Sequence, residues 1–138
     1  DKAGAAYWMH PQRVSQGCTS DEARIAGWLH DLIEDTGTTA EELLTLGFPP
    51  DVVAAAQLDT RRVDESYMDY IQRIVDACDS QDPAVACAGR IAREVKMSDL
   101  RDNMNLSRLR TVTDEDRRRV EKYRMAYATL EQSHGIAL

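Results

Sequence analysis

The chain has 138 residues, of which 43% are hydrophobic and 30% are charged, a balance typical of one globular domain with a single core. Its formal net charge of -7 argues against a general nucleic-acid-binding protein, because such proteins neutralise phosphates with an excess of Lys and Arg. It contains no apolar run of about 18 residues, so no membrane span is expected.

Helical signals begin after an irregular start. Two capping-box patterns, at 19–22 and 38–41, each precede a segment whose apolar residues recur at helical spacing. The second of these segments ends at Gly47, which two prolines follow closely. Three helices are therefore predicted in the first half of the chain: from about Ser20 to Glu34, from Thr38 to Gly47, and from Asp51 to Leu58.

The second half of the chain predicts three longer helices. Each carries an apolar stripe at helical spacing, and Pro83 can occupy the first turn of the middle one. The three are expected over Tyr67–Cys78, Pro83–Asn103 and Asp114–Gln132, with Val85, Ile91, Val95 and Leu100 inward on the second and Val120, Tyr123, Tyr127 and Leu130 inward on the third. No alternating strand pattern occurs, so the predicted fold class is all-α, a compact irregular helical bundle.

The segment His30-Asp-Leu-Ile-Glu-Asp35 at a predicted helix end holds the first candidate site residues. His30 and Glu34 are four residues apart, as are Asp31 and Asp35, so each pair shares one helix face. Adjacent imidazole and carboxylate groups suit a divalent metal ion that accepts both nitrogen and oxygen. The alternative is a structural one, in which the acidic groups are solvated and His30 is an ordinary half-buried histidine.

Two distant segments favour the metal interpretation. His10 stands directly before Pro11, which can begin a helix. Asp99 and Asn103 are four residues apart and share a face of another predicted helix. The chain thus offers histidine and carboxylate groups in three separate places.

Together these segments resemble the HD-domain superfamily of metal-dependent phosphohydrolases. Within it they are most similar to the RelA/SpoT-type (p)ppGpp hydrolase domain and to small stand-alone alarmone hydrolases. The resemblance runs from Lys2 to about Leu109 and rests on a histidine before proline, the H-D-x-x-E-D run, and K-x-x-D-x-x-x-N at 96–103. It implies a single HD-type domain over residues 1–138, without a helix that precedes Lys2 in relatives.

The resemblance also implies roles for individual residues. One divalent ion, expected to be Mn²⁺, would be held by His10, His30, Asp31 and Asp99. Glu34 and Asp35 would position or deprotonate the attacking water. Substrate contacts would come from Lys2, Tyr7, Lys96, Asn103 and Arg61, with Arg62 as an alternative to Arg61. For Lys96 and the two arginines, an ordinary solvated surface position is the competing interpretation.

The expected activity is hydrolysis of a nucleotide pyrophosphate or phosphate ester, with ppGpp cleaved at its 3′-pyrophosphate as the favoured reaction. Three alternatives stay open: an HD phosphohydrolase for another nucleotide or NADPH, a module that binds metal and nucleotide without turnover, and a metal-stiffened interaction domain. The three cysteines lack metal-ligand spacing, which predicts reduced thiols and a cytoplasmic protein. The expected partner is a small nucleotide, without nucleic acid or membrane, and the oligomeric state is left open.

Overall fold

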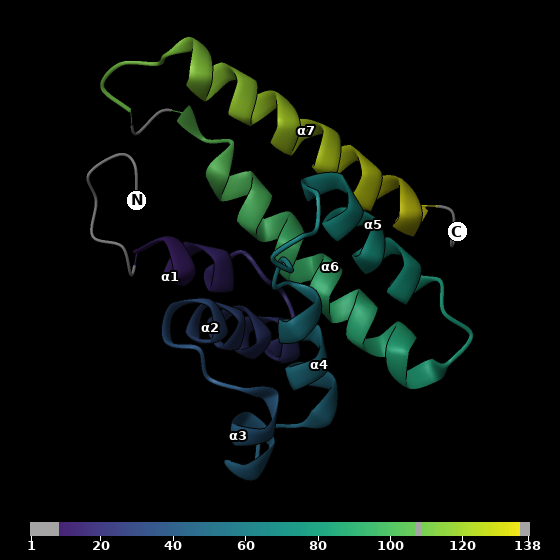
Figure 1. The fold of residues 1–138 in the computed structure, drawn as a ribbon. Coiled ribbons are helices and arrows are strands. Elements are labelled where there is room, and N and C mark those ends of the chain that lie inside the picture. Colours follow the sequence, from purple (N-terminus) through teal and green to yellow (C-terminus); the bar gives the residue numbers. More distant parts are fainter. Residues whose placement is uncertain (1–8, 107–108, 136–138) are drawn as a thin grey trace.

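The computed structural model describes residues 9–106 and 109–135, with side chains as far as Gln132. Over these residues the chain is helical and contains no strand, which confirms the predicted all-α class. The helices, labelled in Figure 1, are α1 (Met9–Gln16), α2 (Asp21–Thr36), α3 (Ala40–Thr45), α4 (Pro50–Leu58), α5 (Tyr67–Cys78), α6 (Pro83–Asn103) and α7 (Asp114–Gly135).

Helix α6 is the element around which the others pack. It contacts α1, α2 and α4 as well as α5 and α7, and Figure 1 shows it running between these two groups. Its middle and final turns are buried, from Ile91 to Leu100 on the inward face. Because α1, α2 and α6 meet one another, polar groups on these three helices can share one site.

Helices α2 and α3 both begin with a side-chain cap, as predicted, but the residues that form each cap differ from the predicted ones. Ser20 is the N-cap of α2 and its hydroxyl accepts from the Ala23 amide, but the Ser20 amide donates to Glu94 of α6. Glu94 of α6 therefore accepts the hydrogen bond that, in a capping box, an acidic residue three positions after the N-cap would accept. In α3 the capping box is formed by Thr39 and Glu42, one residue beyond the predicted pair.

Two other features differ from the sequence prediction. Residues 9–16 form the helix α1, within the part of the chain expected to be irregular, and Pro11, which can begin a helix, lies in its first turn, where a missing amide is harmless. Val85 was predicted to point inward but is exposed, because the first turn of α6 borders a surface groove instead of the core. In α7, Val120 and Leu130 are buried as predicted.

The described part of the chain also bears on membrane spans and on the state of the cysteines. None of its helices has both the length and the apolar character that a membrane crossing requires. All three cysteines are free thiols, and the buried Cys18 donates a hydrogen bond to the carbonyl of Val14 over 3.3 Å. Cys18 therefore behaves as a packing residue of the bundle.

Candidate metal centre

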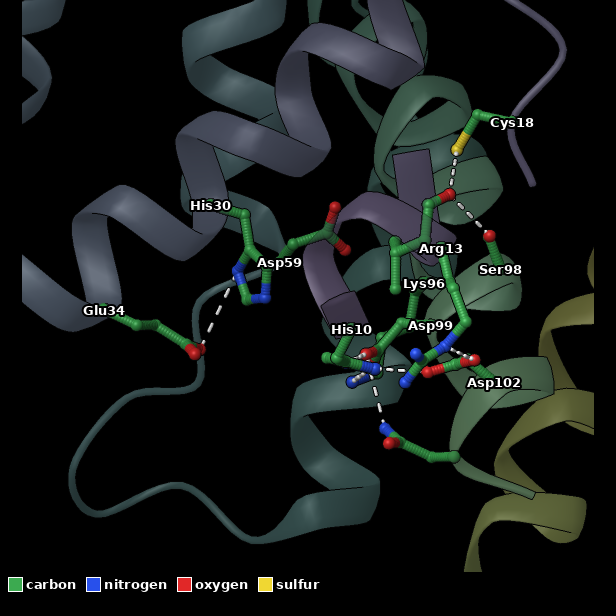
Figure 2. A network of polar contacts seen from close by, with 12 residues as sticks. His10, Arg13, Cys18, His30, Glu34, Asp59, Lys96, Ser98, Asp99 and Asp102 are labelled. Atoms are coloured by element: carbon green, nitrogen blue, oxygen red, sulfur yellow. Dashed lines mark hydrogen bonds and ion pairs between the residues drawn. The ribbon is translucent and has the colours of Figure 1, made fainter. Parts of the chain in front are cut away.

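Helices α1 and α6 join His10 to two carboxylates. The ring donates from Nε2 to Asp99 Oδ1 over 2.8 Å and from Nδ1 to Asp102 Oδ2 over 2.5 Å, and Arg13 Nε donates to the other oxygen of Asp102 over 2.6 Å (Figure 2). Burial lowers the pKa of His10, but the hydrogen bonds to the two carboxylates raise it more, so the net shift is upward. His10 is therefore held between two acids that favour its protonated form.

Asp99 is also paired with Lys96, one turn earlier on α6. The ammonium nitrogen lies 2.8 Å from Asp99 Oδ2 and sits over the rings of Tyr70 and Tyr67, at 5.0 and 5.6 Å from their centroids. Burial alone would raise the pKa of Asp99, but the charge of Lys96 and the His10 hydrogen bond hold it well below its usual range. Lys96 is buried, which excludes the solvated surface position considered for it.

Helix α2 contributes His30 and Glu34. His30 Nδ1 lies 3.7 Å from Glu34 Oε1, and within the described residues this buried nitrogen makes no hydrogen bond. Burial lowers the pKa of His30 to about 4, so the imidazole is neutral and keeps a lone pair for a ligand. Burial also raises the pKa of Glu34 to about 7, near the value that suits a general base.

The imidazole nitrogens and carboxylate oxygens at this centre are donors that a divalent ion accepts, but they do not surround a common position in this structure. Among the residues that the structure describes, no three His, Cys, Asp or Glu side chains already surround a metal position. The contact between His10 and Asp99 explains part of this, since the nitrogen and the oxygen that an ion would bind are hydrogen-bonded to each other. His30 offers a buried, neutral nitrogen, and Asp31 lies half-buried next to it. In their chemistry, these nitrogen and oxygen donors suit a divalent ion.

Of the remaining residues predicted for the site, some lie at this centre and others do not. Asn103 donates from Nδ2 to Asp99 Oδ1 over 3.3 Å and so belongs to the centre, whereas Asp35 is exposed at the end of α2. Arg61 lies outside it, on a groove of about 1160 Å³ whose lining does not include His10 or Asp99. The two residues Lys2 and Tyr7 lie outside the described residues.

The structure adds residues that the sequence analysis did not single out. Asp102 and Arg13 extend the His10 contacts, and a helical spacing of three from Asp99 could have indicated Asp102. Tyr67 was expected only as a core residue, yet three cations surround its ring: Lys122 at 4.7 Å, Lys96 at 5.6 Å and Arg61 at 5.8 Å. Asp59, which follows α4, is buried beside the same centre, and no local signal predicted it.

The chain matches no protein-family model and no curated protein sequence. The family assignment therefore stays a proposal that depends on the motifs and on the contacts described above.

Proposed function

We propose that the chain is a metal-dependent phosphohydrolase that acts on a nucleotide pyrophosphate or phosphate ester, with the 3′-pyrophosphate of ppGpp as the favoured substrate. The observation that carries this proposal is the pairing of two differently tuned groups on α2. His30 is neutral with an unoccupied buried nitrogen, and one turn later Glu34 has a pKa of about 7. A metal ligand and a general base need these two properties.

The ion would be held by His10, His30, Asp31 and Asp99. A bound divalent ion lowers the pKa of water and neutralises charge on a phosphoryl group. Lys96 keeps Asp99 ionised through its 2.8 Å ion pair, so this carboxylate is ready to bind a cation.

Glu34 would accept the proton of the attacking water while the water oxygen bonds to the phosphorus attached to the ribose. The bond from that phosphorus to the ribose 3′-oxygen breaks, the 3′-oxygen leaves and takes up a proton, and pyrophosphate is released with the oxygen from water. The raised pKa of Glu34 makes it a stronger base than an ordinary carboxylate, yet it is still substantially ionised at neutral pH. Asp35, the exposed residue that follows Glu34, would orient the water or a substrate hydroxyl. Lys122 lies over the ring of Tyr67, which also faces Lys96, and would offset the charge of the substrate phosphates.

The proposal is tested by measuring phosphate and pyrophosphate release from ppGpp, other nucleotides and NADPH with added Mn²⁺, before and after chelation. Glu34→Gln keeps the shape of the side chain but removes the base, and we expect turnover to fall about 10²–10⁴-fold. Glu41→Gln on the exposed first turn of α3 is the control and should keep wild-type turnover. Release that survives chelation, or equal rates for wild type and Glu34→Gln, would contradict the mechanism. Nucleotide binding without turnover would favour a non-catalytic module.

A further inference from the structure

Asp59 is a buried acid that the proposed mechanism does not use. It caps the C-terminus of α4 with only 1% of its surface exposed, and neither carboxyl oxygen has a hydrogen-bond partner in the part of the chain that the structure describes. Its backbone carbonyl, in contrast, accepts a 2.5 Å hydrogen bond from the Tyr70 hydroxyl. A buried carboxyl without partners is costly, so a role that provides it with a partner is expected.

Lys96 is the charged group with the largest influence on Asp59. Tyr70 links the two residues, because its hydroxyl donates to the Asp59 carbonyl while the Lys96 ammonium lies 5.0 Å from the centroid of its ring. The nearby positive charge of Lys96 lowers the pKa of Asp59, against the effect of burial. Figure 2 shows Asp59 beside His30, on the side where Lys96 and Asp99 lie. Burial raises the pKa of Asp59, because the charged carboxylate is the form that burial disfavours.

The present partner of Lys96 is the carboxylate that the metal would need. Lys96 has three N–H donors and gives one to Asp99 Oδ2, while His10 occupies Oδ1. When Asp99 binds a divalent ion, the ion and the ammonium would compete for one buried carboxylate. Lys96 is too buried to be solvated instead, so it requires a second acceptor.

We propose that Asp59 is the second carboxylate partner of Lys96 and receives its ammonium group when Asp99 binds the divalent ion. The inference rests on the proposed metal site, and it makes Asp59 a positioning residue that acts through Lys96 and does not bind the ion. The rings of Tyr67 and Tyr70 keep the ammonium between its two acceptors.

A matched control exists at the end of α5. Asp79 also follows a helix, with φ -89° and ψ 1° against φ -81° and ψ 0° for Asp59, but its side chain is exposed. Both amides donate to the carbonyl four residues earlier, so the backbone role is the same. Asp79→Asn therefore reproduces the local effect of Asp59→Asn without disturbing Lys96.

The test measures Mn²⁺ dissociation constants from the spin-resonance signal of the free ion. Loss of a partner that supports a metal ligand typically weakens binding 10–100-fold, so Asp59→Asn should bind Mn²⁺ about 10-fold or more weakly, while Asp79→Asn matches wild type. In a Lys96→Met background the competing ammonium is gone, and Asp59→Asn should then change the constant less than about twofold.

Three results would overturn the inference. Equal constants for Asp59→Asn and Asp79→Asn would show that Asp59 has no part in ion binding. An undiminished loss in the Lys96→Met background would show that Asp59 acts on the ion directly. A wild type that binds no Mn²⁺ would contradict the proposed function itself, whereas the first two results leave that function standing.

A crystal structure of the wild type with Mn²⁺ provides a second measurement, which also decides the matter if Lys96→Met fails to fold. We expect Lys96 Nζ about 2.8 Å from a carboxyl oxygen of Asp59 and Asp99 turned to the ion. A Lys96–Asp99 bond that persists beside bound Mn²⁺, with Asp59 still without a partner, would overturn the inference.

Discussion

Replacing Glu34 with Gln should make the metal-free protein more stable although it lowers turnover. Burial raises the pKa of Glu34 to about 7, although its side chain is 42% exposed. The folded protein thus disfavours a carboxylate that ionises readily in the unfolded chain. Gln keeps the shape and removes the charge, so it removes this penalty.

The direction and size of the effect follow from linkage. A group whose pKa is raised by folding carries no penalty below its ordinary value of 4.5; the penalty grows from there to about pH 7 and is complete above it. Solvent screening at this exposure limits the gain at pH 8 to about 1 kcal/mol. For a chain of this size that gain corresponds to a Tm increase of about 3–5 °C.

The assay is thermal unfolding followed by circular dichroism between pH 4 and pH 8.5, with a chelator present. Glu41→Gln is the control and should stay within about 0.5 kcal/mol of wild type at each pH. The Glu34→Gln gain should vanish near pH 4. A variant that is less stable than wild type at pH 8, or a gain that persists unchanged at pH 4, would refute the assignment of Glu34 as a destabilised base.

Two further predictions concern the scaffold. A Cβ atom at Gly89 would lie 2.5 Å from the backbone nitrogen of Cys78, so Gly89→Ala should destabilise the fold by about 2–3 kcal/mol and lower Tm by roughly 6–12 °C. At Gly27 the nearest atom, Val95 Cγ1, would lie 3.7 Å from the added Cβ, so Gly27→Ala should leave Tm nearly unchanged in the same thermal unfolding experiment. Hydrogen bonds from Arg73 lower the pKa of Glu65 to about 2, so this pair stabilises the fold above about pH 4.5 and the contribution is lost as the pH falls toward 2. Glu65→Gln should therefore cost about 1–3 kcal/mol in urea unfolding at pH 7 and less at pH 3; an equal cost at both would contradict the ion pair.

Local sequence patterns predicted most of the helices but not the contacts between them. The stripe on α5 and the proline at the start of α6 are local signals, and both helices begin where these signals stand. The hydrogen bond from His10 to Asp102, in contrast, joins residues 92 positions apart and depends on how α1 packs against α6. Such contacts leave no periodic trace in the sequence.

The candidate centre likewise contains residues that local motifs predicted and residues that only tertiary packing brings together. Motif order predicted that His10, Asp99 and Asn103 belong together, and their side chains are in contact. It could not predict that Lys96 is buried as the partner of Asp99, because a lysine within a helix is usually solvated. Asp59 was missed for a related reason, since only tertiary packing buries a residue at a helix end.

The most direct test of the metal centre is the number of Mn²⁺ ions bound per chain in equilibrium dialysis, compared for wild type and Asp31→Ala. Two histidine and two carboxylate donors form a mixed nitrogen and oxygen site for one ion. We predict about one Mn²⁺ per wild-type chain and loss of that ion in Asp31→Ala, with the helical content unchanged. Full occupancy in both proteins, or none in the wild type, would contradict the account.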